Sequence, residues 1–135
     1  MPYVAPHDVV AAADGQALLE IAASLGPPPW RRPLAASPAL RAVLWGWPAG
    51  FETVPHVHPR AEELFHVLAG RATFAFAGAP ERTLGPGEVL VAPRGVEHAI
   101  RVLEGDPFVM LIVLAPNEDV PDETVEGTQA AAGAG

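Results

Sequence analysis

The chain has 135 residues, of which 50% are hydrophobic, and its formal net charge is −8. A chain of this length forms one domain that buries roughly two-thirds of the surface exposed by its unfolded state. It has no lysine and no cysteine, which excludes Schiff-base chemistry, disulfides and thiolate metal sites. An acidic chain without a basic cluster is a poor binder of nucleic acid and of anionic membranes.

The sequence shows no targeting or membrane-spanning signal. The first residues, MPYVAPHDVV, lack the basic and apolar regions of a signal peptide. The longest apolar run covers residues 108–115, far fewer than the ~20 residues that a membrane-spanning helix needs. We therefore expect a cytoplasmic protein without membrane contact.

Residues 1–36 are expected to form an arm that precedes the main domain. Apolar residues recur at helical spacing from Leu18 to Leu25, which predicts a short amphipathic helix. Asp14 can cap its start, and Gly26 followed by three prolines ends it and imposes an extended segment. We expect the helix to cover the outside of the domain or a partner subunit.

From residue 37 to 116, short apolar segments alternate with turns that contain glycine or proline. The predicted strands lie near residues 40–47, 51–58, 63–69, 71–78, 81–84, 88–92, 98–104 and 107–114. Such a series indicates an all-β fold, either a closed antiparallel barrel or a double-sheet jelly roll. Gly70 and the pair Gly105-Asp106 are the expected hairpin turns. Residues 117–135 form an acidic tail that is expected either to be solvated or to pack on a neighbouring subunit.

Three histidines and one glutamate have the spacing of a metal site. His56 and His58 are two residues apart, so on a strand both side chains leave the same face. After a short turn, Glu63 can point the same way from the next strand, and His98 offers a fourth donor. This set suits one divalent ion, Fe(II), Mn(II), Ni(II), Zn(II), Co(II) or Cu(II). Four protein ligands leave an octahedral ion open positions for water or substrate, which is typical of catalytic metal sites.

The segments that hold these residues resemble the paired signature of the cupin family. The first motif, a glycine followed by His-x-His, a glutamate and a second glycine, is met from Gly50 to Gly70. The second, a glycine followed by Pro-x-Gly and a histidine, is met from Gly87 to His98, with Val102 where the family often has asparagine. The resemblance implies a double-stranded β-helix, or cupin jelly-roll barrel, and a bound metal. It leaves the reaction open, because the family hosts dioxygenases, isomerases, decarboxylases, lyases, storage proteins and regulators.

Strand parity predicts the wall of a substrate pocket, since residues two or four positions from a ligand share its face. The expected pocket residues are Val54, Phe65, Val67, Ile100 and Val102. On the last strand the sequence does not decide which face points inward. The inward residues are either Phe108, Met110 and Ile112 or Val109, Leu111 and Val113. No inward arginine or lysine is apparent, which argues against a phosphosugar substrate. The apolar wall favours a small apolar or aromatic molecule that binds the ion through one or two oxygens.

Three functions fit these features. A dioxygenase-like enzyme is favoured, because an apolar wall protects reactive intermediates from water. The alternatives are a redox-neutral lyase or isomerase that uses the metal as a Lewis acid, and a non-catalytic module that binds a metal or a small molecule. The candidate general bases are Glu63 itself, a metal-bound hydroxide and Tyr3.

A homodimer is also expected. Residues 1–36, together with Trp30, Trp45 and Trp47, supply apolar surface for contact between two copies.

Overall fold

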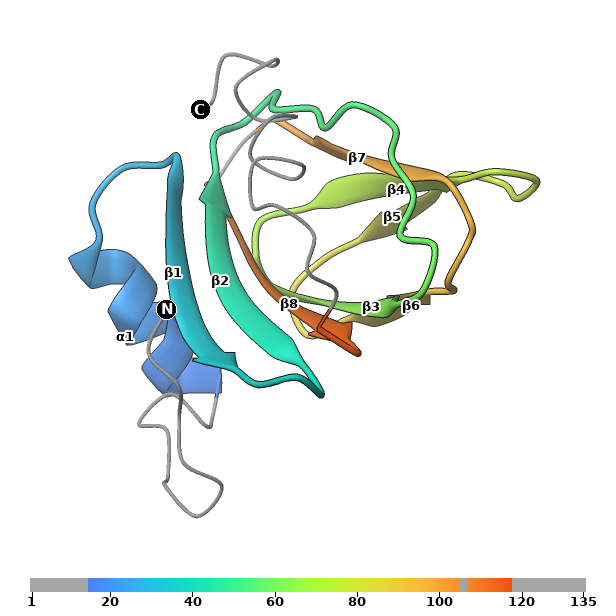
Figure 1. Cartoon of the computed structure of the whole chain (residues 1–135). Helices are drawn as coiled ribbons and strands as arrows, with labels where there is room; N and C mark the ends of the chain where they lie inside the picture. The colour runs from blue at the N-terminus through green and yellow to red at the C-terminus, as the bar shows by residue number, and fades with distance from the viewer. Residues whose placement is uncertain (1–14, 105–106, 118–135) are drawn as a thin grey trace.

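The computed structural model describes residues 15–104 and 107–117. In this part of the chain one helix precedes eight strands (Figure 1). The elements are α1 (Gly15–Ser24), β1 (Trp30–Ala36), β2 (Arg41–Trp47), β3 (Glu62–Ala69), β4 (Ala72–Phe76), β5 (Arg82–Leu84), β6 (Val89–Ala92), β7 (His98–Val102) and β8 (Phe108–Ala115). No helix among the described residues has the length and apolar character needed to cross a membrane.

The described strands form two antiparallel sheets that face each other as the walls of a barrel (Figure 1). The larger sheet has the order β1-β2-β8-β3-β6, and the smaller one has the order β5-β4-β7. Strands far apart in the sequence are therefore neighbours, as β2 and β8 are in one sheet and β4 and β7 in the other. The predicted all-β barrel is confirmed. Gly70 has a φ of 76° at the turn between β3 and β4, whereas the predicted turn at Gly105-Asp106 lies outside the described residues.

The segment 51–58, for which the sequence predicts a regular strand, follows β7 only loosely. Isolated bridges join Glu52 to Arg101 and His56 to His98. Four steps along the segment thus match three steps along β7, which is the one-residue shift of a β-bulge. Pro55 lies within this interval and has no N–H to donate to a ladder.

The shift reverses the side-chain parity before His56. Phe51 and Thr53 are buried, and Val54 is 48% exposed. The prediction that Val54 lines the pocket is therefore wrong, because it assumed an uninterrupted period of two back from His56. Thr53 takes an inner place instead, and its Oγ1 accepts a hydrogen bond of 2.9 Å from the N–H of Ile100.

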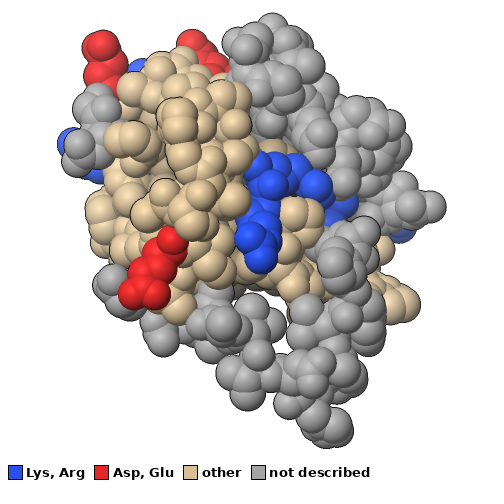
Figure 2. Space-filling view, turned by 90° about the vertical axis from the view of Figure 1, so that its left-hand side faces the viewer, with Lys and Arg blue, Asp and Glu red and all other residues tan. Residues whose placement is uncertain are grey.

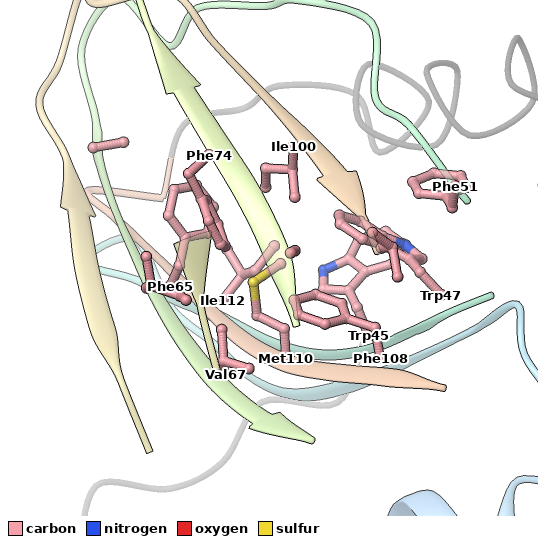
Figure 3. Packing of buried hydrophobic residues seen from close by; sticks show 14 of the residues in the cluster. Trp45, Trp47, Phe51, Phe65, Val67, Phe74, Ile100, Phe108, Met110 and Ile112 are labelled. Carbon is pink, nitrogen blue, oxygen red and sulfur yellow. The ribbon is translucent and has the colours of Figure 1, made fainter. Parts of the chain in front are cut away.

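The inward side chains of both sheets fill the barrel (Figure 3). On β8 the inward residues are Phe108, Met110 and Ile112, which is the first of the two possible inner faces. The rings of Trp47 and Phe108 stack with centroids 6.1 Å apart. Trp45 and Trp47 are 4% and 1% exposed, and the expectation that they supply surface for a dimer is therefore wrong.

The outer face of the larger sheet is covered at one end by α1. Leu18 and Ala22 of this helix pack in one cluster with Leu44, Leu68 and Val109. The position of the helix confirms the prediction, whereas its expected cap, Asp14, lies outside the described residues. Because core packs on one side and helix on the other, β2 is buried on both faces.

The sheet begins before residue 37, the expected boundary of the barrel. Residues 30–36 form β1, which pairs with β2 along its length. The prolines nearby obscure this strand in the sequence. Pro33 is tolerated because β1 is an edge strand and its register shifts between Pro33 and Ala35.

Candidate metal centre

The four predicted ligands meet at one end of the barrel. One donor atom from each of His56, His58, Glu63 and His98 lies within 4.8 Å of every other. Glu63 comes from the start of β3 and His98 from the start of β7, and the two remaining histidines come from the segment between β2 and β3. The sequence prediction that these side chains converge is thus confirmed in the structure.

Backbone hydrogen bonds hold the two motifs together. The N–H of His56 donates to the carbonyl of His98 at 3.0 Å, and the N–H of His98 donates back at 2.9 Å. The N–H of Gly95 donates to the carbonyl of His58 at 2.8 Å. Gly95 has a φ of 74°, a conformation that side chains with a Cβ rarely adopt. The glycine of the second motif thus positions a ligand of the first.

Three of the ligands are shielded from water. His58, Glu63 and His98 are 2%, 3% and 3% exposed, whereas His56 is only half-buried. A pocket of about 230 Å³ borders His98 on the side of Pro55 and Phe76. His56 is therefore the ligand most open to solvent, whereas the pocket is lined mostly by outward-facing residues of the smaller sheet and its flanks, Ala75, Ala77, Glu97 and Ala99.

Backbone carbonyls set the orientation of two imidazole rings. The Nδ1 of His56 lies 2.8 Å from the carbonyl oxygen of Val54, and the Nδ1 of His98 lies 3.2 Å from that of Val96. A carbonyl oxygen can only accept, so each Nδ1 carries the proton and donates. In a neutral ring the Nε2 then presents a lone pair to the site, which is the arrangement usual for metal-binding histidines.

The distances around Glu63 fit a bound cation. Its Oε1 lies 3.0 Å from the Nε2 of His98 and 3.4 Å from the Nε2 of His58. A neutral His98 would therefore point a lone pair at a carboxylate oxygen, and two acceptors at this distance repel unless a cation or an added proton lies between them. Two ligands at right angles on an ion, each with a bond of ~2.1 Å, would be ~3.0 Å apart. The donor set accordingly fits one divalent metal ion.

The electrostatics leave two of the ligands, Glu63 and His56, in the states that metal binding requires. Burial alone raises the pKa of the Glu63 carboxyl, but interactions with His58 and His98 outweigh it and lower the pKa to about 2. Burial lowers the pKa of His56 below its ordinary value. Near neutral pH, Glu63 is therefore ionised and His56 is neutral, as coordination demands.

The remaining predicted pocket residues lie at different depths. The ring of Phe65 is 5.7 Å from the ring of His98, and Ile100 is buried two residues along β7 from this ligand. Val67 and Val102 are four residues along their strands from Glu63 and His98, a distance of ~13 Å, and they pack within the core. Phe65 and Ile100 thus lie next to the ligands, whereas Val67 and Val102 lie deeper in the core, and their contact with a substrate stays a prediction.

Sequence reasoning missed two arginines near the ligands. A crevice of about 10 Å³ beside Glu63 is lined by Arg31 of β1 and Arg41 of β2, together with Val43, Trp45, Ile112 and Leu114. The expectation that no arginine faces inward is therefore wrong. Arg41 shares the parity of Val43, a signal present in the sequence, but Arg31 depends on the unforeseen β1. Figure 2 views the side of the molecule that carries α1 and β1, where basic side chains gather near the middle.

Tyr3, a candidate base, lies outside the described residues.

Comparisons with known proteins agree with this geometry. A family model described as a cupin domain matches residues 43–114. Dimethylsulfoniopropionate lyase DddQ of Ruegeria pomeroyi is 42% identical over 78 residues, which are 58% of this chain and 38% of that protein. Germin-like protein 3-8 of Oryza sativa subsp. japonica is 47% identical over 77 residues, which are 54% of this chain and 33% of that protein. The chain thus spans well under half the length of these two relatives.

Among solved structures, that of KdgF from Halomonas sp. is similar with a TM-score of 0.60 and 30% identity. The match covers 66% of this chain and 81% of KdgF. The family model covers more than half of the chain, and its matched region contains all four residues of the metal centre. The protein belongs to the cupin family.

Proposed function

We propose that this protein is a metal-dependent enzyme of the lyase or isomerase type, which acts on a small oxygen-bearing molecule without net oxidation. The observation that carries the proposal is the convergence of three imidazoles and an ionised carboxylate within 4.8 Å. A bound divalent ion would supply Lewis acidity, which polarises a substrate oxygen. The redox-neutral reaction is favoured because a relative 42% identical over 78 residues is named as a lyase.

The residues around the centre hold and shield the reacting group. His56 and His98 are fixed by hydrogen bonds from Nδ1 to backbone carbonyls, so their Nε2 atoms would hold a bound ion in a fixed place. The rings of Phe65 and Phe76 lie within 5.8 Å of the His98 ring and limit the access of water.

We assign Glu63 the role of a metal ligand, and its role as a general base stays a prediction. The carboxyl is ionised near neutral pH, as a ligand must be. Glu63 therefore contributes negative charge that binds and orients the ion.

The first substrate to test is dimethylsulfoniopropionate, from which elimination releases dimethyl sulfide. The protein is purified without added metal, and its metal content is measured. It is then assayed with Mn(II), Fe(II) or Zn(II) for the release of dimethyl sulfide and for oxygen uptake. We expect turnover of this compound or of a related small acid without oxygen consumption, and loss of turnover in His98→Ala. Metal loading without any turnover across a panel of small acids would leave the binding module as the better description.

A dioxygenase-like reaction is the second candidate. It is favoured by the apolar surroundings of His98, where the rings of Phe65 and Phe76 shield the centre from water. Native iron together with oxygen uptake that depends on an added enol or catechol would select this candidate over the lyase.

We also propose that the protein is a homodimer. Val89 and Val91 on the edge strand β6 are 52% and 48% exposed, and Val91 pairs with the half-buried Leu64 of β3. An exposed apolar edge favours pairing with a second copy. Sedimentation of the protein at micromolar concentration tests this, and a monomer would refute it. The cytoplasmic location stays a prediction, which cell fractionation can test.

A further inference from the structure

We propose that Thr53 is a positioning residue of the metal centre, because its hydroxyl leaves a backbone carbonyl available to orient the imidazole of His56. The inference deepens the proposed function and rests on it, since it concerns the same metal centre. Thr53 is not a ligand and does not touch the ion. The observations that carry the inference are the β-bulge between residues 52 and 56 and the hydrogen bonds within it.

The N–H of Ile100 has an unusual acceptor. Glu52 is opposite Arg101 at one side of the bulge, so the next pair along is Thr53 and Ile100. The N–H of Thr53 donates to the carbonyl of Ile100 at 2.9 Å, and in a regular antiparallel ladder the N–H of Ile100 would donate back to the Thr53 carbonyl. It donates instead to Thr53 Oγ1 at 2.9 Å. A side-chain hydroxyl therefore replaces a backbone carbonyl at this position.

The other side of the bulge shows what this replacement leaves available. The backbones of His56 and His98 exchange two hydrogen bonds. Counted from this pair, two residues back along the segment and two residues forward along β7, Val54 would be opposite Ile100, and its carbonyl would accept from the Ile100 N–H. The observed partner of the Val54 carbonyl is the Nδ1 of His56, at 2.8 Å. The Thr53 hydroxyl thus takes an N–H for which this carbonyl would otherwise compete.

Burial makes the hydroxyl difficult to replace. Thr53 and Ile100 are 6% and 3% exposed, so water is poorly placed to serve as the acceptor, and a buried N–H without a partner is strongly unfavourable. Without the hydroxyl, the N–H of Ile100 must find a backbone carbonyl, and the register beyond the bulge offers that of Val54. The His56 ring would then lose the acceptor that keeps its proton on Nδ1 and its Nε2 lone pair directed at the ion.

The test removes the hydroxyl and follows the tautomer of His56 in the metal-free protein. Thr53→Val keeps the shape of the side chain without the acceptor, and Thr53→Ser keeps the acceptor. The readout is nitrogen NMR of the imidazoles at about pH 8, where histidines are neutral. We expect the proton on Nδ1 of His56 in the unmodified protein and in Thr53→Ser, and a mixture of both tautomers in Thr53→Val. A purely structural role of Thr53 would lower stability without changing this signal.

Thr73→Val is the matched control. Thr73 is similarly buried, at 7% exposed, and its hydroxyl donates to the backbone carbonyl of Arg101, also on β7, at 3.5 Å. It lies three residues along β4 from Phe76, which is opposite His98, a distance of about 10 Å. We expect this variant to keep the tautomer of the unmodified protein. An equal change of tautomer in Thr73→Val would overturn the proposal, because loss of any buried hydroxyl would then have the same effect.

Metal affinity provides a second readout. Loss of a group that only orients a ligand typically weakens metal binding about 10- to 100-fold. We expect the Kd for Zn(II) in equilibrium dialysis to rise by about this factor in Thr53→Val and to stay close to its original value in Thr53→Ser and Thr73→Val.

The outcomes separate this inference from the proposed function. A single Nδ1 tautomer of His56 in Thr53→Val would overturn the role of Thr53 and leave the enzyme proposal intact. If the unmodified protein retains no metal, the enzyme proposal fails, and the tautomers of the metal-free variants still decide the role of Thr53. If Thr53→Val does not fold, Thr53→Ser and Thr53→Ala form a pair that differs in the hydroxyl alone. A proton on Nε2 of His56 in the unmodified protein would overturn the proposal without any variant.

Discussion

Replacement of Glu63 by glutamine separates the metal centre from the folding of the barrel. The substitution keeps the shape of a side chain that is 3% exposed and removes its charge. Its carboxylate oxygen Oε1 lies 3.0 Å and 3.4 Å from the Nε2 atoms of His98 and His58. A glutamine amide can donate to one of these nitrogens, so the metal-free variant should fold at least as well as the unmodified protein.

The cost should fall on metal affinity. Loss of a group that only orients a ligand typically weakens binding about 10- to 100-fold, and we expect loss of the single anionic ligand to reach the upper end. At a metal concentration about 100 times the original Kd, binding stabilises the protein by ~2.7 kcal/mol. With a Kd ~100-fold weaker, the same concentration stabilises it by only ~0.4 kcal/mol. The metal-induced rise in Tm should therefore be smaller by roughly 8 °C in a domain of this size.

The assay is a pair of thermal melts, without and with Zn(II) or Mn(II), supported by equilibrium dialysis to obtain Kd. Glu62→Gln is the control, because Glu62 is exposed and adjacent to the ligand in sequence. We expect this control to keep the full metal-induced shift. An unchanged Kd in Glu63→Gln, or an equal loss in Glu62→Gln, would show that the carboxylate of Glu63 does not hold the ion.

Three further predictions concern pH, packing and core stability. Metal retention should fall below about pH 6, because protons compete with the metal for the imidazoles. Burial lowers the pKa of His56, and Glu63 has a pKa of about 2, so the loss of metal should follow protonation of the histidines and not of the carboxylate. Constant metal retention from about pH 8 to about pH 5 would contradict this. In Gly46→Ala, the new Cβ would lie 2.6 Å from Cζ2 of Trp30, so the indole ring must move, which should cost about 1–3 kcal/mol of stability and shift the tryptophan emission to the red. Gly85→Ala is the control, because the nearest atom to its new Cβ is 3.6 Å away, and the emission should stay unchanged. Phe108→Ala should destabilise the protein by about 3–5 kcal/mol in urea unfolding, because Phe108 is 0% exposed. Val54→Ala, at a side chain that is 48% exposed, should cost under about 0.5 kcal/mol, and similar midpoints for these two variants would contradict the assignment of the core.

Much of the fold could be predicted because its signals are local. The alternation of apolar segments with turns predicted the strands from β2 to β8, and the helical spacing from Leu18 predicted α1. The glycines at turns have positive φ, as Gly70 and Gly95 do, and this requirement is visible in the sequence alone. The strand β1 was not predicted, because its partner β2 stabilises it and the prolines near it have no favourable strand propensity of their own.

The metal ligands were predictable for the same reason, whereas their surroundings were not. His56 and His58 lie beyond the register shift at Pro55, so their common face was correctly read from a period of two. Val54 lies before that shift, and its 48% exposure follows from pairing with β7, which no local pattern reveals.

By itself, the sequence determined which four side chains can hold a metal and that a β-barrel carries them, because residue type, spacing and turn chemistry act over a few residues. Only the tertiary structure decided which face of β8 is the core, where α1 covers the sheet, and that Arg31 and Arg41 share a crevice with Glu63. Those features depend on pairings between strands that are far apart in the chain. The alternation of side chains along a strand shows which residues share a face, but the direction of that face is known only when the register of the pairings is known.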